Sequence, residues 1–334
     1  MSTKSAAQRA RARQMLEIAR RYDLADESKV EISDRLGISR FKVARLLQEA
    51  RESGLVRITL EHGGEPDEAL SRQLARHLAL DAAVAVEAYG TVEEIRRIVG
   101  THAGKVLANT VTRGETLGLA WGRTLTHMIE SIDHLPSVQI LQLNGAVGPS
   151  LSQSPVELAL KASLIGGNNA KAIMAPLYIS DADGVQAIRS QPDIKDVLDS
   201  FDTLTTAVVA VGSLNDTGDG STTSRLLPML PPAVREELLS SGAVAEACGL
   251  TYAADGGLAY RQLSRDHILS ISPQQLRRVP RVIAVASDPS KAEAILALRR
   301  ADVLSELVVD AELAEAILAL PAFVRDRDEA PWPA

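Results

Sequence analysis

The sequence is short of cysteine, of aromatic residues and of long apolar runs. Its only cysteine is Cys248, so no disulfide can form within the chain, and a reducing compartment is expected. No apolar run approaches the roughly 18 residues that a membrane span needs. The N-terminus is polar and basic, without the apolar segment of a secretory signal. We therefore expect a soluble, cytoplasmic protein that has no membrane partner.

Residues that mark metal sites and common catalytic motifs are scarce as well. The six histidines show no close metal-ligand spacing, and no Gly-x-Ser-x-Gly motif is present. Asp181, Asp183 and Gly184 look like the start of a calcium loop, but the later ligands are missing, so a polar turn is expected. Cys248 lies in an apolar stretch and is expected to be an inert core residue. These absences predict no catalytic residue, no metal and no cofactor.

The chain contains abundant small and aliphatic residues instead. At 334 residues it is too long for one small core, so two domains are expected. Hydrophobic residues make up 46% of the sequence and aromatic residues only 3%, which leaves Ala, Val, Leu and Ile as the apolar mass. That composition is typical of α/β proteins, in which helices cover a largely parallel sheet.

The residues from Arg35 to Leu47 predict the turn and second helix of a helix-turn-helix. Gly37 can adopt the left-handed conformation that ends a helix, and Ser39 can cap the next one. An apolar stripe at helical spacing follows the cap and predicts a buried face, made of Val43, Leu46, Leu47 and Ala50. Polar and aromatic residues near the start of this helix are candidates for DNA contacts: Ser39, Arg40, Phe41, Lys42 and Arg45. Phe41 either contacts a base methyl group or packs internally.

The charge distribution agrees with an N-terminal DNA-binding module fused to a domain that does not bind DNA. The net charge is −7, yet residues 1–60 hold 13 Lys and Arg against 8 Asp and Glu, a net of +5. The remainder of the chain therefore carries −12. A basic module fused to an acidic domain suits nucleic-acid binding by the module alone, although a solvated basic face would look the same.

Helical and extended patterns follow one another along the chain. Residues 6–23 and 27–36 predict two helices before the turn, and the alternation at 55–60 predicts a strand, which together indicate a winged-helix-like unit over residues 1–60. Residues 61–66 read as a linker. From 67 to 320, strand and helix signals alternate, which predicts a Rossmann-like α/β domain. Residues 321–334 are expected to form a loosely ordered tail.

Three loops of this domain have the composition of anion sites. In a parallel sheet, ligands bind where strands end and helices begin. Gly122 is followed by Arg123, Thr124 and Leu125, whose amides would be free donors in the first turn of a helix. Gly145 and Gly148 lie in a second glycine loop, and Lys291 closes a third loop that begins at Ser287. Each loop alone is also compatible with a simple turn.

The ordered set of motifs resembles the SorC family of bacterial transcriptional regulators. The similarity runs across about residues 10–320. Three segments carry it: Leu46–Val56 at the end of the helix-turn-helix, Ala120–Leu125, and Arg281–Leu296. The resemblance implies a sugar-binding domain related in fold to sugar-phosphate isomerases and deaminases, without their activity. It also implies a homo-oligomer, a dimer or tetramer, and a phosphorylated sugar as effector.

The resemblance implies roles for individual residues too. Gly122 to Leu125 would hold the phosphate, Gly145 to Gly148 would line the sugar, and Lys291 would contact the ligand from the opposite side. Asp255 corresponds to one of two aspartates in the family, and Ala253 stands at the other. Ser287 and Asp288 replace an expected glycine pair, and Asp288 would repel a nearby phosphate. Ala44 stands where the recognition helix often has serine.

The sequence thus predicts a transcriptional regulator of a carbohydrate catabolic operon. Its partners would be double-stranded operator DNA, a sugar phosphate or a sugar or polyol effector, and further copies of itself. The alternative is an enzyme that processes a sugar phosphate, with residues 1–60 as a docking module. The lack of a convincing acid and base pair near the three loops disfavours that alternative.

Overall fold

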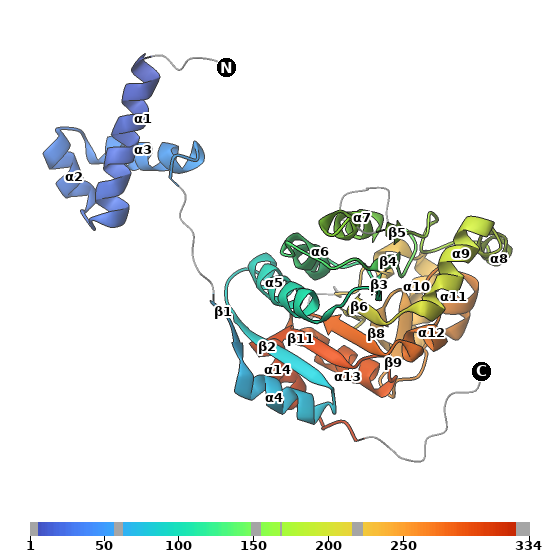
Figure 1. Ribbon diagram of the computed structural model, residues 1–334. Helices are drawn as coiled ribbons and strands as arrows, with labels where there is room; N and C mark the ends of the chain where they lie inside the picture. The colour runs from blue at the N-terminus through green and yellow to red at the C-terminus, as the bar shows by residue number, and fades with distance from the viewer. Residues whose placement is uncertain (1–5, 57–62, 148–154, 168, 216–222, 325–334) are drawn as a thin grey trace. The chain divides into compact units, whose positions relative to one another are not determined.

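The computed structural model describes residues 6–56, 63–147, 155–167, 169–215 and 223–324 (Figure 1). The chain divides into two compact units, Met1–Glu61 and His62–Ala334. No helix among the described residues is long and apolar enough to cross a membrane.

The first unit consists of three helices, and local signals set their ends. Helix α1 (Ala6–Ala19) continues into a π-helical turn (Arg20–Leu24), and α2 (Lys29–Leu36) and α3 (Arg40–Glu52) follow. Ser28 and Glu31 form a capping box at the start of α2. Gly37 ends α2 with φ 63°, in the left-handed region that favours glycine. The Ser39 hydroxyl accepts a hydrogen bond from the Lys42 amide at 3.3 Å, which confirms the predicted cap of α3.

The predicted stripe of α3 forms the core of this unit. Val43, Leu46, Leu47 and Ala50 are buried and pack with Ile18 and Ile32 of the other two helices. Val30, which the helical pattern places at an apolar point of α2, is 54% exposed instead. The reason is that eight residues of helix offer one narrow buried stripe, which Ile32 occupies. The predicted strand at 55–60 begins as a bend at residues 55 and 56, and residues 57–62 lie outside the described residues.

A largely parallel sheet of eight strands organises the second unit. Its spatial order is β1-β2-β11-β10-β6-β3-β4-β5, and only the edge pair β1–β2 is antiparallel. The strands are β1 (Gly63–Asp67), β2 (Ala82–Ala88), β3 (Thr116–Leu119), β4 (Gln139–Gln142), β5 (Asn169–Lys171), β6 (Thr206–Ala210), β10 (Arg281–Val285) and β11 (Glu306–Asp310). The predicted α/β class is confirmed, and the buried strand residues form one continuous core with the covering helices.

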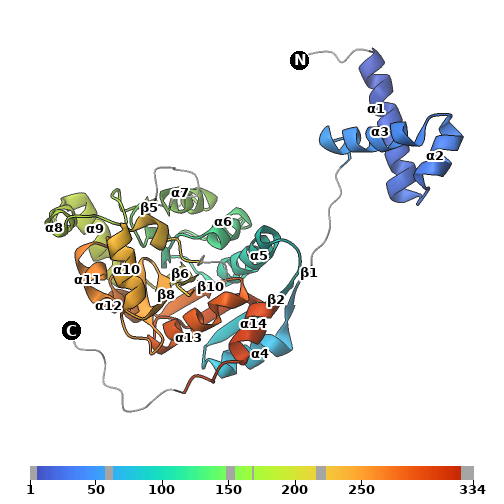
Figure 2. The same ribbon diagram turned by 180° about the vertical axis from the view of Figure 1, so that it is seen from behind.

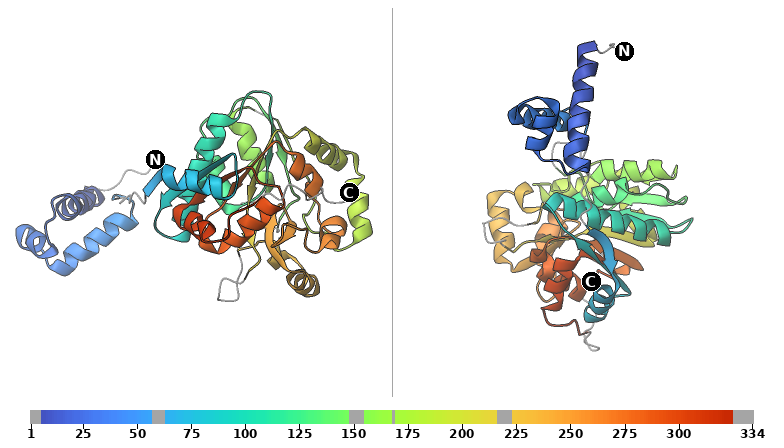
Figure 3. Two further views of the ribbon diagram at one scale, coloured as in Figure 1. Left: turned by 90° about the horizontal axis from the view of Figure 1, so that it is seen from below. Right: turned by 90° about the vertical axis from the view of Figure 1, so that its left-hand side faces the viewer.

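Helices cover both faces of this sheet. Figure 1 shows α5 (Val92–Thr110), α6 (Arg123–Glu130) and α7 (Pro155–Ile165) above it. Three others lie below it, where the view from below in Figure 3 shows them side by side: α4 (Glu68–His77), α13 (Ala292–Arg300) and α14 (Ala311–Leu318). Gly100 and Gly104 allow α5 and α6 to pack closely, because a Cβ on Gly100 would lie 2.6 Å from the Thr124 carbonyl oxygen.

A second, smaller sheet was not predicted from the sequence. Strands β7 (Gly212–Ser213), β8 (Ala243–Ala247) and β9 (Leu250–Ala253) are antiparallel, and β8 and β9 contact α13. Helices gather on that side of the unit, as Figure 2 shows: α8 (Ala182–Arg189), α9 (Pro192–Ser200), α10 (Pro232–Ser240), α11 (Arg261–Asp266) and α12 (Pro273–Arg278). The residues expected to form a polar turn at 181–184 cap and begin α8.

Two predicted boundaries need correction. Residues 63–66, expected to be linker, belong to β1, which pairs with β2 through a bulge between Gly63 and Pro66. Glycine and proline suit this position because β1 is an edge strand, where missing ladder bonds are tolerated. The predicted tail also begins too early. The Phe323 amide donates to the His77 carbonyl at 2.9 Å and its ring lies 4.2 Å from the Arg299 guanidinium carbon, whereas residues 325–334 lie outside the described residues.

Candidate anion-binding and DNA-binding sites

A small cavity lies where three neighbouring parallel strands end. Strands β3, β6 and β10 are adjacent in the sheet, and the segments that follow their carboxyl ends meet there. The cavity measures about 50 Å³. Its described lining consists of Arg96, Trp121, Gly122, Arg123, Thr124, Ala210, Val211, Gly212, Thr223, Arg225, Glu246, Val285 and Lys291. We call it the anion cavity, since four of these side chains are cationic and one is acidic.

Helix α6 directs its N-terminus at this cavity. Gly122 precedes the helix, and its backbone is extended at φ 165°, so no left-handed strain is involved. Glycine is required for space: a Cβ there would lie 2.5 Å from the Ala210 Cβ. The amides of the next three residues have no acceptor among the described residues, because the first bond of the helix runs from the Thr126 amide to the Gly122 carbonyl. Free amides at the positive end of a helix bind anions.

The cations around the cavity carry few compensating charges. Burial and repulsion from Arg96 and Arg225 lower the pKa of the Arg123 guanidinium. Arg225 lies over the Trp121 ring at 5.2 Å from its centroid, and Arg96 pairs with Glu93 at 3.4 Å. No described residue forms a hydrogen bond or an ion pair with the Arg123 side chain. Several cations would therefore attract a bound anion, and few existing ion pairs would have to break.

Two buried groups of opposite type share the cavity wall. Burial lowers the pKa of Lys291 to about 8, and repulsion from Arg96 and Arg123 acts in the same direction. Burial raises the pKa of Glu246 to about 7, although Glu246 accepts a hydrogen bond from the Gly249 amide at 2.8 Å. Both groups therefore titrate within two pH units of neutrality, which makes the charge of the cavity sensitive to pH.

Asp288 stands in a conformation that suits glycine. Its φ is 96°, inside the region that side chains rarely adopt, and it replaces part of the glycine pair of the resembling family. Its carboxylate accepts hydrogen bonds from the amide and hydroxyl of Ser290 at 3.0 and 2.7 Å. The carboxylate is thus engaged by its own loop, and its charge raises the pKa of Lys291.

The structure brings together only part of the candidate effector residues. Gly122, Arg123, Thr124 and Lys291 line the anion cavity, whereas the Leu125 side chain is fully buried beside it. The Gly145 amide donates to the Leu269 carbonyl at 2.9 Å, and a Cβ on Gly145 would meet the Pro176 backbone at 2.7 Å. That amide is therefore unavailable to a ligand. Gly148 lies outside the described residues.

Asp255 is also apart from the cavity. It is exposed in the turn after β9, where its carboxylate accepts from the Gly257 amide at 2.7 Å. This turn packs against Arg300 at the end of α13, whereas Lys291 precedes the start of that helix. Three charged residues of the cavity were not predicted: Arg96, Arg225 and Glu246. The only local signal for Glu246 is an acidic residue inside the apolar stretch Ala243–Ala247.

The candidate DNA contacts form one exposed surface of α3. Arg40, Phe41, Lys42 and Arg45 are exposed, and Phe41 is 73% exposed, so it does not pack internally. The Arg40 guanidinium carbon lies 5.1 Å from the Phe41 ring centroid. Glu49 is bound by Arg11 at 2.7 Å and lies 3.7 Å from Arg45, which leaves Arg45 only loosely held.

Comparison with known proteins assigns the second unit to a family. The profile of the family described as "Putative sugar-binding domain" matches residues 65–319. The chain belongs to this family. The anion cavity lies within the matched residues. This match, together with the regulators described next, confirms the resemblance to the SorC family.

Relatives and solved structures cover most of the chain. The transcriptional regulator LsrR of Enterobacter sp. (strain 638) is 27% identical over 296 residues, which cover 87% of this chain and 88% of that protein. LsrR of Escherichia coli (strain K12) is 25% identical over 295 residues, 86% of this chain and 89% of that protein.

Solved structures share the fold. The full-length sorbitol operon regulator SorC from Klebsiella pneumoniae gives a TM-score of 0.66 at 23% identity and covers 92% of this chain and 99% of that chain. A transcriptional regulator from Streptococcus pneumoniae TIGR4 gives 0.68 at 21% identity and covers 75% of this chain and 96% of that chain. These relatives are regulators, and they give the enzyme alternative no support.

Proposed function

We propose that this protein is a DNA-binding transcriptional regulator of a carbohydrate catabolic operon, controlled by a phosphorylated sugar in the anion cavity. The observation that carries the proposal is the meeting of Arg123, Lys291 and the free amides of α6 at the ends of β3, β6 and β10. Cations together with a helix N-terminus bind phosphate. The description of the family as sugar-binding supports a sugar as the group that carries this phosphate.

The acidic member of the cavity fits a sugar hydroxyl. Glu246 accepts hydrogen bonds when ionised and can donate one when protonated, so it can orient a hydroxyl group in either state. A neutral sugar or polyol would leave the cations without a partner, so a phosphorylated effector satisfies the cavity better. Asp288 offers less repulsion than its position suggests, because its carboxylate is held by Ser290.

On the DNA side, α3 would enter the major groove with its first turns. Arg40, Lys42 and Arg45 would contact bases and phosphates, and Phe41 would contact a base methyl group. The Ser39 hydroxyl already caps α3, so Ser39 would contact a phosphate through its backbone amide instead. One helix of this kind reads too few bases for high specificity, so the protein would act as a dimer or tetramer on paired half-sites, in the cytoplasm where its operator lies.

The effector would control DNA binding by shifting the protein between two conformations. The cavity is too small for a sugar phosphate in the described state, so binding requires its walls to part or to rearrange. An effector that binds one arrangement better than the other changes the spacing of paired recognition helices. Gly145 to Gly148 and Asp255 would contribute only after such a rearrangement.

The alternative function, an enzyme that processes a sugar phosphate, has no support from the relatives, which are named transcriptional regulators. Incubation of the protein with sugar phosphates distinguishes the two: binding without turnover supports the regulator, whereas turnover supports the enzyme.

The proposal is tested by thermal unfolding with a panel of sugars. Glucose 6-phosphate, fructose 6-phosphate, ribose 5-phosphate and their unphosphorylated forms are each added to the full chain. A phosphorylated effector is expected to raise Tm, because it binds only the folded protein. The increase should disappear in Arg123→Met and Lys291→Met and persist in Arg72→Met, an exposed residue outside the cavity. A Tm increase that survives in both cavity variants contradicts the proposal.

A further inference from the structure

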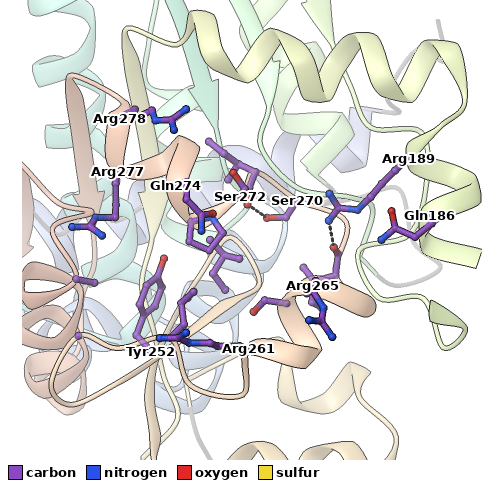
Figure 4. A pocket seen from close by; sticks show the side chains of 18 residues that line it. Gln186, Arg189, Tyr252, Arg261, Arg265, Ser270, Ser272, Gln274, Arg277 and Arg278 are labelled. Carbon is purple, nitrogen blue, oxygen red and sulfur yellow. Dashed lines mark hydrogen bonds between the residues drawn. The ribbon is translucent and has the colours of Figure 1, made fainter. Parts of the chain in front are cut away.

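A second and larger cavity lies elsewhere in the same unit. It measures about 650 Å³, within the range of about 300–1,000 Å³ that small-molecule sites occupy. Figure 4 shows it between β9, α8, α11 and α12. It shares no described lining residue with the anion cavity. Ala301 in its wall follows α13, whereas Lys291 precedes this nine-residue helix, so about 14 Å of helix separates the two.

The larger cavity is strongly cationic. None of its described lining residues is acidic. Five arginines line it: Arg189, Arg261, Arg265, Arg277 and Arg278. Arg265 is paired with the neighbouring Asp266 at 2.7 Å. In the described part of the chain, nothing forms a hydrogen bond or an ion pair with the side chains of Arg277 and Arg278. In a chain of net charge −7, such a concentration of positive charge marks a site for anions.

Buried polar atoms in its wall lack partners. The Tyr252 side chain is 2% exposed, and its hydroxyl has no hydrogen-bond partner among the described residues. The same holds for the Arg189 Nε and the Ser264 Oγ, although the Arg189 Nη2 donates to the Ile268 carbonyl at 2.9 Å. A buried polar atom without a partner destabilises the folded state, and native proteins satisfy nearly all of them. Three such atoms around one cavity indicate a ligand that completes them.

The arrangement also defines the shape of that ligand. Figure 4 shows Arg277 and Arg278 on one side of the cavity and Arg189 on the other. The lining of the cavity also includes the apolar residues Leu250, Ile268 and Ile271. Charges on two sides of an apolar surface suit a molecule with an anionic group at each end and an apolar body between.

We propose that this cavity binds a small organic dianion, with Arg277 and Arg189 contacting its two anionic groups and the Tyr252 hydroxyl donating to one of them. The ring or carbon chain of the ligand would cover Leu250, Ile268 and Ile271. This second site is independent of the effector proposed for the anion cavity, because the two share no described residue.

The test uses naphthalene-2,6-dicarboxylate as the probe and 2-naphthoate, which has a single carboxylate, as its matched control. Isothermal titration calorimetry of the full-length protein is expected to show binding of the dicarboxylate about tenfold tighter than of the monocarboxylate, since one charge-assisted contact is missing. Arg277→Met is expected to weaken dicarboxylate binding by about tenfold or more. Lys291→Met and Arg72→Met are expected to leave it unchanged.

Tyr252→Phe separates a ligand role from a structural one. Removing an unpartnered buried hydroxyl should leave Tm unchanged or slightly higher, while weakening the dicarboxylate severalfold. Three results would overturn the proposal: no binding of the dicarboxylate to the wild type at millimolar concentration, equal binding by Arg277→Met, or loss of binding only in Lys291→Met. The last result would assign the probe to the anion cavity.

Discussion

The two units differ in how far apart in the sequence their site residues lie. The candidate DNA contacts of the first unit come from seven consecutive positions, Ser39 to Arg45, at the start of one helix. The anion cavity of the second unit draws on residues from Arg96 to Lys291, which meet only because β3, β6 and β10 are neighbours in the sheet. A surface on one helix is encoded locally, whereas a cavity at the end of a sheet is encoded by topology.

The units differ in electrostatics as well. Arg40 and Arg45 are exposed, so water screens their charges and their contribution to folding is small. Lys291 is buried, and the protein holds its charge at a cost. Substitutions of Arg40 and Arg45 should therefore change DNA binding alone, whereas substitutions in the anion cavity should change effector binding and stability together.

The largest expected effect is on DNA affinity. The Arg40→Ala, Arg45→Ala double variant should bind the DNA upstream of its own coding sequence about a hundredfold more weakly, because two cations leave the groove. Its Tm should remain close to that of the wild type. Fluorescence anisotropy over a series of salt concentrations measures this, with Arg72→Ala as the control. Unchanged DNA affinity would mean that α3 is an ordinary surface helix.

The second prediction concerns the space at Gly122. Gly122→Ala should destabilise the protein by about 1–3 kcal/mol and abolish the Tm increase caused by a sugar phosphate, because the new methyl group overlaps Ala210. Adding Ala210→Gly removes the overlapping atom and should restore both. Chemical denaturation measures the free energy of unfolding. A single variant with normal stability and normal effector binding would refute the close packing.

The third prediction concerns the pH dependence of the affinity for a sugar phosphate. Below pH 8 Lys291 is charged, and from pH 7 to pH 9 it loses its proton, so the affinity for a sugar phosphate should fall by about tenfold. Glu246 ionises as the pH passes about 7 and repels an anion, so it lowers the affinity in the same direction. Calorimetry at pH 7, 8 and 9 measures the change.

The sign of the stability effect provides an independent check of the same residue. The folded-state pKa of Lys291 lies below its ordinary value of 10.5, so its charge opposes folding below pH 8 and this penalty disappears as the pH rises towards 10.5. Lys291→Met should therefore raise Tm at pH 7 while it weakens the effector and flattens the pH dependence. A variant that lowers Tm and keeps the pH dependence would show that Lys291 is structural.

The smallest expected effect is on the cap of α3. Ser39→Ala removes the acceptor of the Lys42 amide and should destabilise the first unit by about 1 kcal/mol. Ser39→Asp should retain the cap. Hydrogen exchange of the amides of α3 measures this locally, and exchange in the second unit should not change. Equal protection in Ser39→Ala and the wild type would exclude a role for the cap.

The same contrast explains what was predictable from the sequence. Gly37, Ser39 and the buried stripe of α3 depend on neighbours within one or two turns, and all were predicted. Arg123 was predicted because a glycine and the start of a helix mark its loop, and Lys291 because a helix start follows its loop. Arg96 and Glu246 were missed, because nothing near them in the sequence indicates which strand ends they approach. The sequence does not reveal whether the Gly145 amide is free, since a glycine after a strand looks the same whether its amide is free or, as here, bonded to the Leu269 carbonyl.

Strand β1 shows that composition alone does not distinguish a linker from an edge strand. Gly63, Gly64 and Pro66 read as linker residues, and only pairing with the distant β2 makes them an edge strand. The small sheet β7-β8-β9 escaped prediction for a related reason. Its strands are two to five residues long, too short for an alternating pattern to stand out.

The central claim is that occupation of the anion cavity changes DNA binding by the other unit. The most direct measurement is the affinity of the full-length protein for the DNA upstream of its coding sequence, with and without the sugar phosphate that raises Tm most, in the wild type and in Arg123→Met. We predict that the sugar phosphate changes the affinity of the wild type by about tenfold and leaves Arg123→Met unaffected. An equal response of both proteins, or no response of either, would contradict the claim.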